Sequence, residues 1–349
     1  MRYVVIILLF VGNFTTAQQQ LPLRGLAIAA PDSENVDRFV SFIDRQLSPL
    51  EINTLILRVD YNYRYKSHPE LANHNALSQD DVDKIVEVCA KHNISIVPQI
   101  NLLGHQSWAE ELGNLLEVYP QFDETPEVKL PETYKWPNDD DLYCKSYCPL
   151  HPDIHQIVFA LVDEVVAAFK ADAFHAGMDE VFYIANPDCP RCGGMDKAEL
   201  FALEVTKIRN HLATHGKRLW IWGDRLLDGK VTGLGMWEAS MNATHRAIDL
   251  IPKDVFICDW HYERADPTAV YFAMKGFDVA SCAWRNPTVA KKQQQFLKDL
   301  RTSATALMKD RYQGMIQTVW VSADSFMDMW EQNQTQEANE ATTMKALFN

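Results

Sequence analysis

The sequence has few basic residues and few long apolar runs, and both shortages limit the classes of function it can have. Its 349 residues contain 33 Lys and Arg against 47 Asp and Glu, a formal net charge of −14. This negative charge makes nucleic acids and anionic membrane surfaces poor partners, whereas neutral or cationic ligands suit it. Beyond the first residues no segment approaches the length of a membrane helix. There is no internal repeat and no low-complexity linker, so a solenoid is not expected.

The apolar run at the N-terminus resembles a targeting segment. Arg2 precedes an apolar stretch at 4–11, and Thr15, Thr16 and Ala17 follow it. A basic start, a short apolar centre and small residues at the end predict a secretory signal over residues 1–17. A retained N-terminal anchor is the alternative. We therefore expect a secreted or exported protein (periplasmic, extracellular or lumenal) that does not span a membrane.

In such an oxidising compartment the seven cysteines favour disulfides. Cys144 and Cys148 are spaced C-x3-C, and Cys189 and Cys192 are spaced C-x2-C, all in expected loops. Disulfides within or between these pairs are one interpretation. A four-cysteine zinc site is the other, because C-x2-C suits tetrahedral zinc. The remaining cysteines, at 89, 258 and 282, lie in apolar patterns and are expected in the core.

Strands and helices alternate along the rest of the chain. This order is typical of an α/β protein, here a (β/α)8 TIM barrel in a single catalytic domain over residues 18–349. A long irregular insertion with five prolines occupies about 109–150, and a loop of that length is usually functional. The expected strands cover residues 23–29, 54–59, 95–100, the apolar run that begins at 173 and ends near Gly177, 218–222, 255–260, 278–283 and 315–319.

Two adjacent acids, Asp179 and Glu180, follow the fourth expected strand. Environment can split the pKa values of two such carboxyl groups, so that one stays ionised and the other holds a proton. A solvated Asp-Glu pair that merely ends a strand is the alternative. Other polar and aromatic residues stand at the ends of neighbouring strands, where a barrel has its active site. They are His105, Trp222, Asp224, Trp260, Tyr262, Trp284 and Trp320. Aromatic walls with interspersed carboxylates suit a sugar ring.

Three motifs resemble glycoside hydrolase family 20, the β-N-acetylhexosaminidases. His-Ala-Gly-Met-Asp-Glu at 175–180 is similar to the family's His-x-Gly-Gly-Asp-Glu, and 97–105 is similar to its Pro-Glu-x-Asp-x-Pro-Gly-His. Arg24-Gly25 resembles the Arg-Gly that opens the family's barrel. The resemblance is closest to the compact hexosaminidase D-like branch, because the expected barrel begins soon after the signal.

The resemblance implies an exo-acting, retaining enzyme that removes terminal β-linked GlcNAc or GalNAc from a glycan or glycoconjugate. In this chemistry Glu180 is the acid and base, and the substrate's own acetamido oxygen is the nucleophile. Asp179 would orient the acetamido group, and Tyr262 would bond its oxygen. The remaining expected substrate-binding residues are Arg24, His105, Trp222, Asp224, Trp260, Trp284 and Trp320. No cofactor and no catalytic metal are expected, and the oligomeric state is left open.

The chain departs from the family's pattern at three positions. Met178 replaces the second Gly, Asn101 stands where many members have Asp, and Leu103 replaces a Pro. Asn101 would remove or reroute a His-Asp relay to Glu180. Two other interpretations stay open: a non-catalytic amino-sugar-binding barrel and, with less support, a metal-dependent barrel hydrolase. The second would need clustered His and acidic ligands at the strand ends.

Overall fold

A closed barrel of eight parallel strands forms the centre of the molecule. The computed structural model describes residues 20–134, 144–332 and 338–349, so the expected signal at 1–17 lies outside the described residues. The strands lie in the order β1-β10-β9-β8-β7-β6-β3-β2 around the barrel. Their bounds are β1 Leu23–Ala29, β2 Thr54–Arg58, β3 Ser95–Leu102, β6 Ala173–Gly177, β7 Arg218–Trp222, β8 Phe256–Trp260, β9 Asp278–Ala283 and β10 Tyr312–Thr318.

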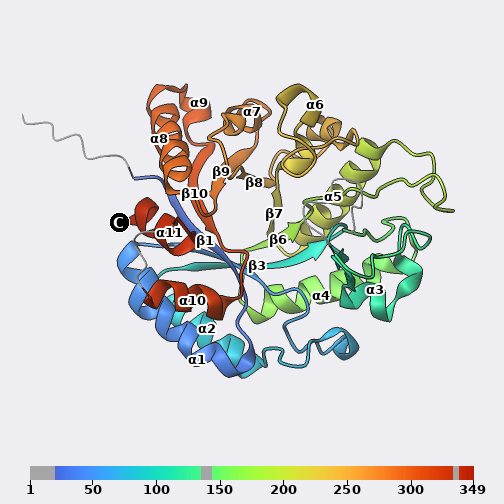
Figure 1. The fold of residues 1–349 in the computed structure, drawn as a ribbon, viewed down its shortest axis with the longest axis horizontal. Coiled ribbons are helices and arrows are strands. Elements are labelled where there is room, and N and C mark those ends of the chain that lie inside the picture. The colour runs from blue at the N-terminus through green and yellow to red at the C-terminus, as the bar shows by residue number, and fades with distance from the viewer. Residues whose placement is uncertain (1–19, 135–143, 333–337) are drawn as a thin grey trace, which may run out of the picture.

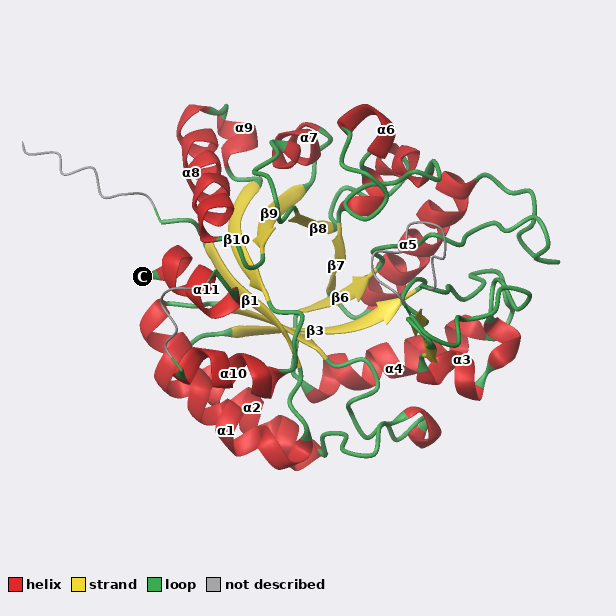
Figure 2. Cartoon of the chain, in the orientation of Figure 1, coloured by secondary structure: helices red, strands yellow, loops and turns green. Residues whose placement is uncertain are grey.

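Helices surround this barrel, as Figures 1 and 2 show. Most connect consecutive strands, which gives the alternation that the sequence predicts. They are α1 Val36–Phe42, α2 Gln79–Lys91, α4 Ile154–Ala168, α5 Lys197–Thr214, α6 Gly229–Thr232, α7 Thr268–Met274, α8 Pro287–Ser303 and α9 Ala306–Lys309. After the last strand, α10 Ala323–Glu331 and α11 Glu340–Phe348 fill the ring between α8 and α1. None of the helices in the described part of the chain is both long and apolar enough to cross a membrane.

Side chains divide between two cores according to the alternation along each strand. On β1, Leu23 and Ala27 point into the barrel, whereas Leu26 and Ile28 pack against the helices. The barrel interior is filled by large residues of the other strands, among them Trp220, Trp222, Phe256, Trp260 and Ile316. The barrel is therefore a packed core rather than a pore, and a ligand site must lie at one of its ends.

The helix α2 begins with a capping box at Ser78. The Ser78 hydroxyl accepts the Asp81 N–H at 3.2 Å, and the Asp81 carboxylate accepts the Ser78 N–H at 3.0 Å. This reciprocal pair satisfies two backbone donors that a helix start leaves unpaired. The insertion is less irregular than expected in its first half. It contains a two-stranded antiparallel ribbon, β4 Ser107–Trp108 with β5 Glu111–Leu112, and the helix α3 Asn114–Val118.

Candidate active site

The two acids leave the barrel through a tight turn at the end of β6. The strand ends at Gly177, and Met178 and Glu180 have positive φ values of 69° and 48°. Residues other than glycine rarely adopt this backbone conformation. It costs about 1–3 kcal/mol per residue and is common at active sites. His175 helps to fix the turn, because its Nδ1 accepts the Gly177 N–H at 3.0 Å. Burial lowers the pKa of His175 to about 3, so this imidazole is neutral and structural.

The loop after β3 lies against this turn. A side chain at Gly104 would place its Cβ 2.7 Å from the Asp179 carbonyl oxygen, so only glycine allows this approach. Gln106 secures the loop by donating its amide to the Asn101 and Gly104 carbonyl oxygens, at 2.9 and 2.8 Å. Between Gly104 and Gln106, His105 adopts a positive φ of 54°. The loop thereby directs the imidazole toward the acids.

The His105 imidazole lies next to both acids. Its Nε2 lies 3.2 Å from Asp179 Oδ2 and 3.2 Å from Glu180 Oε2. Burial opposes a charge on His105, but the Asp179 carboxylate raises the imidazole pKa well above its usual range. Burial would likewise raise the pKa of Asp179, yet the nearby His105 brings it below its usual value. Both shifts favour an imidazolium next to an ionised Asp179.

Asp224, at the end of β7, holds the backbone of the acid rather than facing the cavity. Its Oδ2 accepts the Glu180 N–H at 3.0 Å and the Arg225 Nε–H at 2.6 Å. Trp260 donates its indole N–H to Asp224 Oδ1 at 3.4 Å. Burial raises the pKa of Asp224 to about 6, although Arg225 works in the opposite direction. Asp224 is thus a positioning residue for Glu180.

Aromatic rings form one side of the site. Trp260 stacks on Tyr262 with ring centres 5.0 Å apart, and Tyr262 contacts Trp284 at 5.3 Å. Trp320 donates its indole N–H to the Tyr262 hydroxyl at 2.9 Å, and the Thr318 hydroxyl oxygen lies 3.4 Å from the same group. Trp222 lies below Trp320 with a ring distance of 5.8 Å and is fully buried, so it supports the wall without facing the cavity.

Two charged residues in this site, Arg58 and Asp60, are missing from the sequence-based prediction. Arg58 ends β2 and points inward, and its guanidinium lies 4.7 Å from the Trp320 ring centre. It donates to the Val319 carbonyl oxygen at 2.9 Å, but its buried Nε has no hydrogen-bond partner within the described residues. Asp60 accepts the Asn101 N–H at 2.8 Å. Burial raises its pKa, against the opposing effects of Asn101, Arg58 and His105.

Comparison of the sequence with models of known protein families identifies the family of this chain. The model of the glycosyl hydrolase family 20 catalytic domain covers residues 42–344, most of the chain. The chain belongs to glycosyl hydrolase family 20. Its relatives in this family include a β-hexosaminidase of Vibrio furnissii, 24% identical over 58% of this chain, and one of Porphyromonas gingivalis, 27% identical over 57%. The aligned parts are 29% and 26% of those proteins, so the match spans little more than a quarter of each relative's length.

Solved family 20 structures share the barrel. A Flavobacterium johnsoniae chitobiase superimposes with a TM-score of 0.64 at 18% identity, covering 94% of this chain and 48% of the other. Dispersin B superimposes with a TM-score of 0.54 at 14% identity, covering 94% of this chain and 98% of the other. At such identities the likeness concerns the fold, and the predicted (β/α)8 barrel is confirmed.

The structure places Arg24 apart from the other residues that the family 20 resemblance indicates. Arg24 shares the outward face of β1 with Leu26 and Ile28, near the start of the strand. Its guanidinium donates to the carbonyl oxygens of Leu50 and Phe348 at 2.7 and 2.8 Å. These bonds fasten the C-terminal helix to the end of the barrel opposite the acids. The other residues expected at the site form one connected group there: Asp179, Glu180, His105, Trp222, Asp224, Trp260, Tyr262, Trp284 and Trp320.

The expected disulfides do not form in this structure. All seven cysteines are free, and the sulfurs of Cys148 and Cys189, for example, are 3.6 Å apart, whereas a disulfide bond is about 2.05 Å long. The four-cysteine zinc site is also wrong in its membership. Cys144 lies by the acids, with its Sγ 3.9 Å from Glu180 Oε2, and Glu124 joins the other three cysteines instead. His105, Cys144 and Glu180 make a second group that could hold a metal ion.

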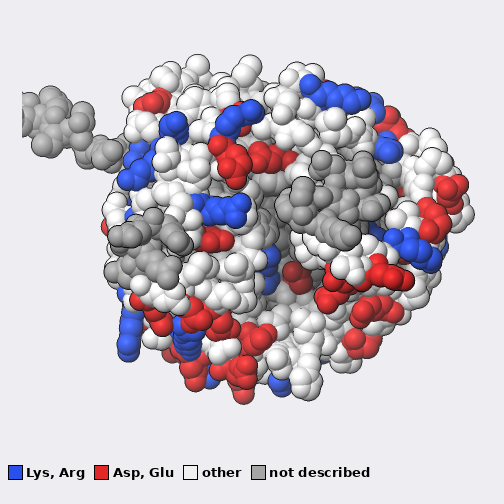
Figure 3. Space-filling model, viewed as in Figure 1, with Lys and Arg blue, Asp and Glu red and all other residues white. Residues whose placement is uncertain are grey.

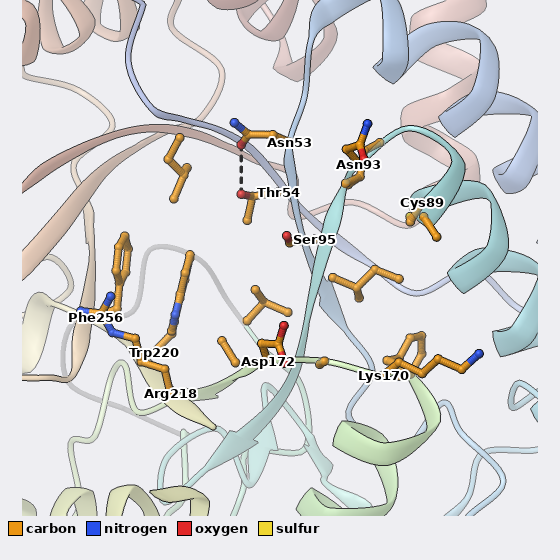
Figure 4. Close-up of a pocket in the computed structure, with 18 of the residues that line it drawn as sticks. Asn53, Thr54, Cys89, Asn93, Ser95, Lys170, Asp172, Arg218, Trp220 and Phe256 are labelled. Carbon is orange, nitrogen blue, oxygen red and sulfur yellow. Dashed lines mark hydrogen bonds between the residues drawn. The ribbon is translucent and has the colours of Figure 1, made fainter. Parts of the chain in front are cut away.

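A hollow lies at the other end of the barrel. It has a volume of about 710 Å³ and is lined by residues that begin strands, including Thr54, Ser95, Arg218 and Phe256 (Figure 4). Its size does not make it the active site, because barrel enzymes place their chemistry at the carboxyl ends of the strands. Figure 3 shows another hollow near the centre of the face in view, with both acidic and basic side chains inside it.

Proposed function

We propose that the protein is an exo-acting, retaining β-N-acetylhexosaminidase that uses the substrate's acetamido group as its nucleophile. The supporting observation is the arrangement of Asp179, Glu180 and His105 at the end of β6. The His105 imidazole lies 3.2 Å from both acids, where its positive charge would favour an ionised Asp179 and its N–H would lie beside the side chain of Glu180. Membership of family 20 agrees with this proposal. The proposed substrate is a glycan or glycoconjugate with a terminal N-acetylhexosamine.

The acetamido group fits between Asp179 and Tyr262. Asp179 Oδ1 is buried and has no hydrogen-bond partner within the described residues, so it is available to accept the acetamido N–H. The Tyr262 hydroxyl accepts a bond from Trp320, and its own proton would turn from the long 3.4 Å contact with Thr318 to the acetamido oxygen. Held by these two groups, that oxygen would attack the anomeric carbon from within the same molecule, at high effective concentration.

Glu180 is assigned the proton transfers. It would protonate the leaving glycosidic oxygen as the acetamido oxygen attacks, and would then take a proton from the incoming water. The ionised Asp179 would stabilise the positive charge of the ring intermediate. Arg58 replaces Arg24 as the proposed ligand of the sugar's hydroxyl groups, because it points into the cavity and has an unpaired N–H. Trp260, Trp284 and Trp320 would enclose the apolar faces of the sugar.

The first experiment compares p-nitrophenyl β-GlcNAc and β-GalNAc with the matching β-glucoside. We expect turnover of the acetamido sugars only, and Glu180→Gln should lower kcat by roughly 10²–10⁴-fold. Glu87→Gln, the same change on an exposed helix position, is the matched control. Equal turnover of the glucoside, or near-normal activity of Glu180→Gln, would refute the proposal. Binding of amino sugars without turnover in the unchanged protein would instead favour a non-catalytic sugar-binding barrel.

A second experiment tests the nucleophile and the stereochemistry. Fluorination of the acetamido methyl group withdraws electrons from the carbonyl oxygen, so turnover should fall from the mono- to the trifluorinated substrate. Proton NMR of the first product formed should show the β-anomer, as retention requires. A rate that does not depend on fluorination would exclude the acetamido group as nucleophile. Export of the protein remains a separate proposal, tested by locating it in cell fractions and sequencing its mature N-terminus.

A further inference from the structure

Beside the site, four buried side chains from three separate segments bring their ligand atoms together. Glu124 follows the short turn Pro120–Phe122, Cys148 precedes α4, and Cys189 and Cys192 lie between β6 and α5. All four are buried, and one ligand atom of each lies within 4.8 Å of the others. The family 20 reaction proposed above uses none of them. We propose that Glu124, Cys148, Cys189 and Cys192 bind one structural zinc ion.

The sulfur distances match a tetrahedral metal site better than a disulfide. Cys148 Sγ lies 3.6 Å from Cys189 Sγ and 3.8 Å from Cys192 Sγ. With Zn–S bonds of about 2.3 Å, two sulfur ligands of a tetrahedron are about 3.8 Å apart. A carboxylate oxygen of Glu124 lies 2.8 Å from Cys192 Sγ, so this side chain must move outward slightly to complete the tetrahedron.

The turn that carries two of the ligands is built around a glycine. Gly193 donates its N–H to the Cys189 carbonyl oxygen at 2.9 Å. A Cβ at Gly193 would lie 2.6 Å from that oxygen and 2.7 Å from the Pro187 carbonyl oxygen. Only glycine therefore permits the tight turn that brings Cys189 and Cys192 to the same side. The C-x2-C spacing of these residues is that of structural zinc sites.

Glu124 gives a second, independent reason to expect a cation. Its side chain is 1% exposed, and its Oε1 accepts the Asn186 N–H at 3.0 Å. Within the described ranges, no nitrogen of a Lys, Arg or His lies within 4.0 Å of its carboxylate. Buried carboxylates are normally paired with a positive charge or bound to a metal. Three cysteine sulfurs select zinc over calcium or magnesium, which prefer oxygen ligands.

A zinc ion here would connect the loops that surround the acids. Cys189 and Cys192 lie in the loop that begins with Glu180, and Cys148 is four residues from Cys144, whose sulfur contacts Glu180. Glu124 brings in the insertion after β3. On binding, the ion would replace the protons of the three thiols, and Glu124 would supply the fourth, anionic ligand. The site would thus be structural, separate from the proposed chemistry at Asp179 and Glu180.

The test is the metal content of the full chain, purified without chelator. Mass spectrometry of the metal should give one zinc per chain, and Cys192→Ser should lose it. Cys89→Ala, which removes a core thiol elsewhere, and Cys144→Ala should both keep it. X-ray absorption at the zinc edge of the unchanged protein should show three sulfurs at about 2.3 Å and one lighter ligand. This measurement keeps the test valid even if Cys192→Ser does not fold.

Three results would overturn the proposal. If the protein contained no metal and only five free thiols were counted after denaturation without reductant, the cluster would hold a disulfide. Seven thiols and no zinc, even after incubation with the ion, would show a cluster of free thiols. Zinc that is lost in Cys144→Ala but kept in Cys192→Ser would place the metal at His105, Cys144 and Glu180 instead. None of these readouts depends on turnover, so the proposed hydrolase activity can fail while the zinc site stands.

Discussion

Comparing alanine variants of Arg58 and Arg24 tests which arginine binds the sugar. The Arg-Gly motif indicates Arg24, whereas the structure places Arg58 beside Trp320 and within the electrostatic reach of Asp179. We expect Arg58→Ala to remove a charge-assisted hydrogen bond to the substrate, worth about 1.5–3 kcal/mol. This corresponds to a loss of roughly 10–150-fold in kcat/KM, and twice that free energy if two sugar hydroxyls are bound.

Arg24→Ala should act on stability alone. It removes hydrogen bonds to Leu50 and Phe348 at the opposite end of the barrel, so the unfolding free energy should fall by about 1–3 kcal/mol. Its kcat/KM should stay near that of the unchanged protein. Urea unfolding and kinetics on the p-nitrophenyl substrates separate the two effects, and Arg58→Lys serves as a second variant that keeps the charge. A large loss of kcat/KM in Arg24→Ala, with Arg58→Ala nearly unaffected, would refute the assignment.

Two further predictions follow from local geometry and charge. Gly104→Ala should lower kcat by about tenfold or more in a folded protein, because its Cβ would lie 2.7 Å from the Asp179 carbonyl oxygen; unchanged kinetics would contradict this. Despite burial, Asp259 and Glu238 raise the pKa of His261 to about 10, while the unfolded value is near 6.5. Stability from His261 is therefore fully present below about pH 6.5 and is lost as pH rises toward 10. Urea midpoints should show that decline, and His261→Gln should flatten it.

The barrel could be predicted from sequence because its signals are local and repeated. Alternating apolar strands and amphipathic helices give the element order, and the bounds of β1, β7 and β9 are predicted without error. The end of β6 near Gly177 is also predicted correctly. The left-handed backbone of Met178 and Glu180 after it is not predicted, because a positive φ leaves no apolar periodicity in the sequence.

Residues whose partners are distant in sequence were harder to predict. Glu124 lies in a proline-rich insertion, and its thiol partner Cys192 is 68 residues away, so neither periodicity nor spacing points to it. Arg58 had a usable signal. It shares the inward parity of Ile56 on β2, while Arg24 has the parity of the outward residues of β1. Applying the strand alternation to both arginines would have corrected the expectation that the dipeptide motif suggested.

The last departure from the family pattern makes its own prediction, about the acid that supports His105. Asn101 stands where the resemblance leads one to expect Asp, but its N–H and side chain contact the buried carboxylate of Asp60. His105 lowers the pKa of Asp60 without a hydrogen bond between them, so Asp60, just after β2, is the carboxylate we expect to support the imidazole from this side. Asp60→Asn should therefore lower kcat and shift its pH profile. The exchange Asp60→Asn with Asn101→Asp should recover part of the loss, because it restores a carboxylate near the imidazole. If Asp60→Asn left both kcat and the pH profile unchanged in a folded protein, the carboxylate would be a structural ligand of Asn101 and no part of the relay.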